Sequence, residues 1–185
     1  MRPITSLLFL LALLAATAVT QQADSGTSRG TKAKFVLTSS AFAQGAEIPA
    51  QFTCKGADTS PDLEWQGAPA QVAVFALITD DPDAPDGTWV HWVAWNLPPS
   101  AHSLPAGVPK QPELNDGTRQ GRNDFQRVGY NGPCPPPGKP HRYFFRLYAL
   151  NRKVDLAPGA TRAELDAAIK NYIVAEAEYM GTFHR

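Results

Sequence analysis

Three apolar runs constrain the fold of this chain more strongly than any other feature of its sequence. They span residues 71–81 (QVAVFALITDD), 88–97 (TWVHWVAWNL) and 140–150 (PHRYFFRLYAL). Short apolar, β-branched runs that lie between turn residues predict strands rather than helices. The chain also has 17 prolines and 14 glycines among 185 residues, which indicates many turns and therefore short strands. We expect a mostly β fold.

The residue pattern within these runs predicts which side chains share a face. The run 71–81 is mostly apolar, which is typical of a strand buried on both faces. Strict alternation in the other two runs predicts two sets of side chains that share a face. These sets are Trp89, His91, Val93 and Trp95 in one strand, and His141, Tyr143, Phe145, Leu147 and Ala149 in the other.

Other elements are predicted nearer the ends of the chain. Phe35–Thr38 is a candidate for a short strand, and residues 161–172 carry apolar side chains at helical spacing. Thr161 and Glu164 have the spacing of a capping box, which indicates that a helix begins at this point. Residues 173–185 then alternate with period two, and this pattern predicts a terminal strand.

The first residues have the composition of an export signal. Arg2 precedes an apolar run over 7–16, and the small residues at 16–18 fit a cleavage site. An apolar run of about 10 to 15 residues is too short to span a bilayer comfortably, so a signal peptide is favoured over a retained anchor. We predict a signal peptide over 1–18, a flexible polar lead-in over 19–34 and one folded domain over 35–185. The mature protein is then periplasmic or secreted, with no integral membrane segment.

The charge balance narrows the range of partners. Lys and Arg number 17, as do Asp and Glu, and the formal net charge is zero. No basic excess indicates a nucleic-acid partner, and no acidic excess indicates a cationic one. We expect no nucleic-acid binding, and the sequence leaves the oligomeric state open.

The two cysteines, Cys54 and Cys134, both lie in segments rich in turn residues. Disulfides persist in oxidising compartments, so the predicted export favours a bond between them. Two separate buried thiols are the alternative, because the sequence alone does not place the two Cα atoms within bridging distance.

Polar side chains suited to ligand binding lie in or next to the three apolar runs. Asp81 and Asp83 are at the end of the first run, His91 lies inside the second, and His141 and Tyr143 are at the beginning of the third. A desolvated imidazole can hold a carboxylate with one nitrogen and offer the other to a ligand. Two imidazoles and a phenol suit an oxyanion, with carboxylates available to set tautomers. Taken singly, each of these residues also has an ordinary structural explanation.

As a set, these segments resemble the phosphatidylethanolamine-binding protein family, and more narrowly its bacterial and archaeal branch, described as Raf-kinase-inhibitor-like. The resemblance runs from about Phe35 to Arg185. It is carried by DDPDAPDGTWVHWVAWNLP, GRNDFQRVGYNGPCPPPGKPHRYFFRLYAL and AEAEYMGTF. It implies a phosphatidylethanolamine-binding-protein-like fold, in which a large antiparallel sheet packs on a smaller sheet, with one helix near the C-terminus.

The resemblance also implies a small pocket that accepts phosphate, acetate or a phosphorylated headgroup. The pocket positions of the family correspond here to Asp81, Asp83, His91, Pro133, His141 and Tyr143. The segment NGPCPPPGKPHRY over 131–143 is expected to form a rigid rim above this pocket, because its five prolines reduce the entropy that is lost on ordering.

We therefore expect a non-catalytic binding protein for a small anionic or phosphorylated ligand, with no cofactor and no catalytic residue. The sequence contains neither a Gly-x-Ser-x-Gly turn nor a glycine-rich phosphate loop. One alternative is a serine protease inhibitor that acts through the stiff Pro-rich loop, an activity known in the family. The other is a metal-dependent hydrolase with two histidines and a carboxylate as ligands, although the histidines lack a paired spacing such as His-Glu-x-x-His.

Overall fold

The structure, a computed structural model, describes residues 34–185. The predicted signal peptide (1–18) and all but the last residue of the predicted lead-in (19–34) lie outside the described residues. The strands are β1 (Val36–Thr38), β2 (Leu63–Gln66), β3 (Val74–Asp81), β4 (Trp89–Leu97), β5 (Ser103–Leu104), β6 (Arg119–Gln120), β7 (His141–Leu150) and β8 (Ile173–Phe183). The helical elements are the 3₁₀ turn η1 (Ala50–Phe52) and the helix α1 (Arg162–Ile169).

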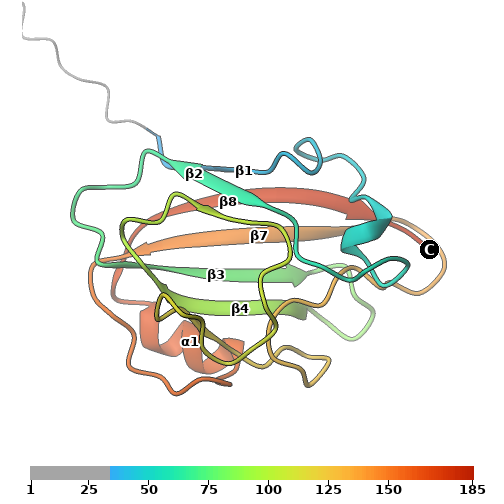
Figure 1. Cartoon of the computed structure of the whole chain (residues 1–185). Helices are drawn as coiled ribbons and strands as arrows, with labels where there is room; N and C mark the ends of the chain where they lie inside the picture. The colour runs from blue at the N-terminus through green and yellow to red at the C-terminus, as the bar shows by residue number, and fades with distance from the viewer. Residues whose placement is uncertain (1–33) are drawn as a thin grey trace, which may run out of the picture. The chain divides into compact units, whose positions relative to one another are not determined.

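The strands form two antiparallel sheets (Figure 1). The large sheet has the order β6-β4-β3-β7-β8, and the small sheet has the order β1-β2-β5. This confirms the predicted mostly β fold with a large sheet on a smaller one. The sequence pattern missed β2, β5 and β6, because runs of two to four residues are too short to show a period.

Two hydrophobic clusters cover opposite faces of the large sheet. One lies between the sheets and joins Leu37 and Trp65 of the small sheet to Phe75 and Leu147 of the large one. The other lies against α1 and includes Ile78, Trp95, Leu165 and Ile169. β3 contributes to both clusters, and all eight of its residues are buried, which confirms the prediction from its continuous apolar run.

The helix α1 begins as predicted and ends earlier than its apolar spacing suggested. The Thr161 side chain accepts a hydrogen bond from the Glu164 amide, and the Glu164 carboxylate accepts one from the Thr161 amide, so the capping box is formed. The helix ends at Ile169, and the Tyr172 amide donates to the Ile169 carbonyl in a turn that leads into β8. Tyr172 is therefore not a helical residue.

A β-bulge in β4 changes the predicted direction of His91. Thr79 of β3 is opposite Trp92 and Asp80 is opposite Val90, so His91 has no partner on β3. An extra residue of this kind shifts the alternation by one position. His91 accordingly contacts Tyr143, in the cluster between the sheets, whereas Val93 and Trp95 face α1. The predicted shared face of His91 with Val93 and Trp95 is wrong for this reason.

Candidate functional site

A cavity of about 190 Å³ lies at one end of the large sheet, where β3 ends and β4 and β7 begin. Four of the six residues predicted as ligand-binding line it: Asp81, His91, His141 and Tyr143. Antiparallel pairing brings them together, because the end of β3 adjoins the starts of both neighbouring strands. The volume is below the roughly 300–1,000 Å³ of pockets for drug-sized ligands, so the cavity suits a small group.

The imidazole of His141 is oriented by Asp81. Its Nδ1 lies 2.8 Å from the Asp81 carboxylate, and both side chains are nearly buried. A carboxylate accepts hydrogen bonds, so Nδ1 carries the hydrogen and Nε2 is left for a ligand. The other oxygen of Asp81 accepts from the Asp83 amide at 2.8 Å, which holds Asp81 in place.

The imidazole of His91 is oriented by the backbone of the long loop. Its Nδ1 donates to the Asn131 carbonyl at 2.7 Å, and the ring lies between the rings of Phe125 and Tyr143. Burial lowers the pKa of His91 below its ordinary 6.5. The neutral ring therefore presents Nε2 as an acceptor, which suits a protonated oxygen of an acid phosphate or carboxylic acid.

Tyr143 supplies the phenol. Its hydroxyl is buried and makes no hydrogen bond within residues 34–185 that satisfies normal geometry. Burial, reinforced by the negative charge of Asp81, raises the pKa of Tyr143 above its ordinary value, so the hydroxyl keeps its proton. A buried donor without a partner costs free energy unless something else accepts from it. A ligand oxygen or a water in the cavity can do so.

Two of the predicted residues do not line the cavity. The Asp83 carboxylate accepts from Nε and Nη2 of Arg142, at 2.8 and 2.7 Å, and from the Arg142 amide at 3.0 Å. The hydrogen bonds from the Arg142 side chain lower the pKa of Asp83 to about 2. Pro133 contributes its carbonyl to a hydrogen bond from the Cys54 amide. Asp83 and Pro133 therefore support the residues around the cavity.

The other walls of the cavity come from two groups of residues. Cys134, Pro135 and Pro136 belong to the segment 131–143 that was expected to form a rim, whereas the turn 84–86, Trp89 and Phe125 were not predicted to lie here. Phe125 reaches His91 because the long loop runs back along β4, where the Asp124 amide donates to the Val90 carbonyl and the Asp124 side chain accepts from the Val90 amide. The only signal in the sequence for Phe125 was that it is a lone aromatic residue in a polar loop.

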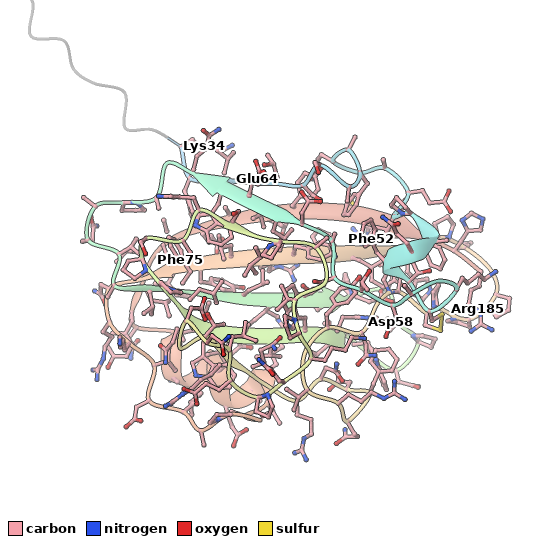
Figure 2. All side chains as sticks on the ribbon, viewed as in Figure 1. Lys34, Phe52, Asp58, Glu64, Phe75 and Arg185 are labelled. Carbon is pink, nitrogen blue, oxygen red and sulfur yellow. A yellow bond between two sulfur atoms is a disulfide. The ribbon has the colours of Figure 1, made fainter. Side chains whose placement is uncertain are left out.

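The predicted disulfide is present. Cys54 and Cys134 are bonded, with their Cα atoms 5.4 Å apart. It joins the segment after η1 to the Pro-rich segment, and Figure 2 shows its sulfur in yellow at the end of the molecule that carries Arg185.

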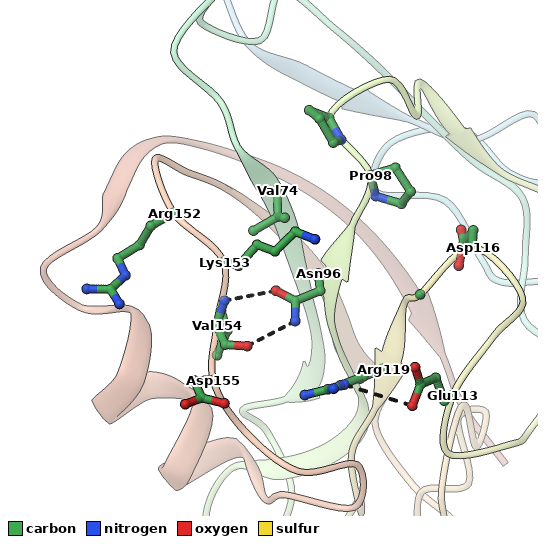
Figure 3. Close-up of a pocket in the computed structure, with 12 residues that line it drawn as sticks. Val74, Asn96, Pro98, Glu113, Asp116, Arg119, Arg152, Lys153, Val154 and Asp155 are labelled. Atoms are coloured by element: carbon green, nitrogen blue, oxygen red, sulfur yellow. Dashed lines mark hydrogen bonds and ion pairs between the residues drawn. The ribbon is translucent and has the colours of Figure 1, made fainter.

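A larger cavity, of about 570 Å³, lies at the opposite ends of the same strands, near Val74 and Asn96 (Figure 3). Its charged groups are mixed: Arg119, Arg152 and Lys153 lie with Glu113, Asp116 and Asp155. Figure 3 shows that the Asn96 amide pairs with both backbone groups of Val154. This cavity has no buried imidazole or phenol, so the smaller one is the better candidate for an anion site.

Two further observations apply to residues 34–185, the part of the chain that the structure describes. No helix in this part of the chain is long and apolar enough to cross a membrane. Nor does the described part bring together three or more His, Cys, Asp or Glu side chains in an arrangement that could hold a metal ion.

Comparison with known proteins gives consistent matches over most of the chain. The family model described as phosphatidylethanolamine-binding protein matches residues 38–184. A UPF0098 protein of Methanothermobacter thermautotrophicus is 46% identical over 149 residues, which cover 80% of this chain and 98% of that protein. One from Pyrococcus horikoshii is 46% identical over 150 residues, covering 80% of this chain and 75% of that one.

Solved structures agree with these sequence matches. The crystal structure of YbcL from E. coli, described as a member of the mammalian PEBP family, matches with a TM-score of 0.78 and 33% identity, covering 83% of this chain and 99% of that one. The structure of CT736 from Chlamydia trachomatis, described as a putative homologue of the same family, has a TM-score of 0.75 and 36% identity, covering 82% and 98%.

Proposed function

Because this chain belongs to the phosphatidylethanolamine-binding protein family, we propose that it binds a small phosphorylated or carboxylate-bearing anion between His91 and His141. The observation that carries the proposal is the hydrogen bonding of the two imidazoles and their position in one cavity. Each has its Nδ1 engaged by a protein oxygen, and each lines one small cavity that also contains the Tyr143 phenol. Polar groups that converge in a small cavity are typical of ligand sites.

The proposal is for binding without catalysis. The cysteine that lines the cavity is held in a disulfide, so it is not available as a nucleophile. Export to the periplasm or the cell exterior is part of the proposal and is supported by the same disulfide, because such bonds persist in oxidising compartments. Inhibition of serine proteases by residues 131–143 stays a sequence-based prediction, which an assay with chymotrypsin and elastase would check.

Isothermal titration of inorganic phosphate tests the proposed site. His141→Ala should weaken phosphate binding by at least about tenfold, because hydrogen bonds to charged groups contribute about 1.5–3 kcal/mol. The matched control is His102→Ala, which removes an exposed imidazole that does not line the cavity. Circular dichroism should show that both variants remain folded. Equal phosphate affinity in His141→Ala and the wild type would contradict the proposal.

A further inference from the structure

The Cys54–Cys134 disulfide is accessible at the surface. Cys54 is exposed and Cys134 is half-buried. Cys134 lines both the small cavity and a neighbouring one of about 390 Å³ that also contains Asp58 and Arg127. Figure 2 shows the sulfur close to the labelled Asp58 and Arg185. A thiolate in solution can therefore approach the sulfur of Cys54, and access is one of the factors that set the rate of thiol–disulfide exchange.

The segment that follows Cys134 depends on this bond for its position. Up to Pro133 the chain is held by hydrogen bonds, such as those from the Gly132 amide to Asp58 and from the Cys54 amide to the Pro133 carbonyl. Between residues 134 and 140 the described structure has no backbone–backbone hydrogen bond. Four of these seven residues are prolines, which have no N–H to donate.

A cationic group lies next to the inner sulfur. Nη1 of Arg185 is 3.6 Å from Sγ of Cys134. Positive charge near a sulfur stabilises the thiolate and makes it a better leaving group. Attack on Cys54 is therefore favoured over attack on Cys134, since it releases the thiolate beside the guanidinium.

We propose that Cys54 is a site of thiol–disulfide exchange with a dithiol reductant, and that this exchange controls the anion cavity; the second part rests on the proposed function. A reductant thiolate attacks Sγ of Cys54 and forms a mixed disulfide, while the bond to Cys134 breaks and its electron pair leaves as the Cys134 thiolate. The second thiolate of the reductant attacks the mixed disulfide, which oxidises the reductant to its own disulfide and releases Cys54 as a thiolate. Water supplies the protons that the released thiolates take up.

Loss of the Cys54–Cys134 disulfide affects the ligand site because the residues after Cys134 form part of the cavity wall. Pro135 and Pro136 line the cavity directly after Cys134. Without the disulfide, this wall is held by side-chain packing alone and must be ordered when a ligand binds. Because ordering even one residue costs a substantial part of a small ligand's binding free energy, the reduced protein should bind phosphate about tenfold more weakly.

The first experiment locates the exchange. The folded protein is treated with the monothiol glutathione, quenched with an alkylating agent, and mapped by peptide mass. The expected product carries glutathione on Cys54 and the alkyl group on Cys134. Arg185→Gln should form this product more slowly, because its leaving thiolate is less stabilised. The assignment of Cys54 as the exchange site is overturned if the folded protein forms no adduct. It is also overturned if glutathione is found on Cys134.

The second experiment tests, without a ligand, whether reduction of the disulfide makes the segment after Cys134 more mobile. After reduction with dithiothreitol, the ¹H–¹⁵N NMR signals of Gly138 and Lys139 should narrow and move towards disordered values. The Gly121 amide, which donates to the Val93 carbonyl, serves as the control and should not change. Unchanged signals of Gly138 and Lys139 would overturn the proposal that the disulfide controls the cavity through this segment. Unfolding of the whole chain would overturn it as well.

The phosphate titration is then repeated on the reduced protein. A loss of about tenfold in affinity supports control of the cavity, and equal affinity in the two states overturns it. If the oxidised protein itself fails to bind phosphate, the proposed function and its control are both overturned, while the adduct on Cys54 still decides the exchange chemistry.

Discussion

At the scale of single residues, hydrogen bonds decide which nitrogen of each imidazole is left for a ligand. His141 is oriented by the Asp81 carboxylate and His91 by the Asn131 carbonyl. Both acceptors engage Nδ1, so the two Nε2 atoms are the groups offered to the cavity. The partners differ in charge, because Asp81 offers a carboxylate and Asn131 a neutral carbonyl. The two rings therefore present different environments to an anion.

The buried His91 predicts how stability depends on pH. Its pKa is lowered in the folded protein from the ordinary 6.5, so the unfolded chain binds the proton more readily. The contribution of His91 to stability is complete above pH 6.5 and decreases as the pH falls below that value. Urea unfolding between about pH 7 and 5, where carboxylates stay ionised, should show this loss. His91→Gln should reduce the dependence, and an equally steep dependence in that variant would contradict the assignment.

At the scale of elements, β3 carries two adjacent carboxylates to opposite faces of the large sheet. Asp81 holds His141 at the cavity. Asp80, which is 1% exposed, instead accepts from Arg146 of β7 and Arg162 of α1. Asp80 thereby links the helix to the centre of the sheet. Removing one partner of a buried ion pair leaves uncompensated charge, which is costly.

Asp80→Ala should therefore destabilise the protein by about 3 kcal/mol or more, because Arg146 and Arg162 lose their shared acceptor. The measurement is the free energy of unfolding in urea. Asp155→Ala is the matched control, since that carboxylate is exposed and takes part in no ion pair within residues 34–185. The control should change stability by less than about 0.5 kcal/mol. A similarly small effect of Asp80→Ala would show that the two arginines do not depend on it.

Alternation predicted the elements well where pairing is regular. In β7 every second residue from His141 to Ala149 is buried, so His141 and Tyr143 were placed correctly on one face. In β4 the same rule failed at His91, because the bulge arises from pairing with β3 and not from the sequence of β4 alone. Phe125 could not be assigned to the cavity for a related reason: its place depends on how the long loop docks on β4.

At the scale of the whole molecule, the cavity is assembled from segments that are remote in sequence and are held together by the sheet and the disulfide. Cys54 and Cys134 are separated by 80 residues. Tyr130 adds a second link between the same regions by donating from its hydroxyl to the Phe52 carbonyl at 2.8 Å. Closing so long a loop restricts the unfolded chain considerably.

Replacement of both cysteines by serine should lower the free energy of unfolding by about 4 kcal/mol, because a closed loop of this length removes much entropy from the unfolded state. Denaturant unfolding of the oxidised wild type and of the double variant measures the difference. Dithiothreitol should bring the wild type close to the variant and leave the variant unchanged. Equal unfolding midpoints for the oxidised wild type and the variant would show that the disulfide does not stabilise the fold.

The most direct test of the anion site is a crystal structure of the oxidised protein grown in inorganic phosphate. The account predicts density for one phosphate within hydrogen-bond distance of Nε2 of His91, Nε2 of His141 and the Tyr143 hydroxyl. Density for phosphate elsewhere, with the small cavity filled by water alone or closed by side chains, would contradict it.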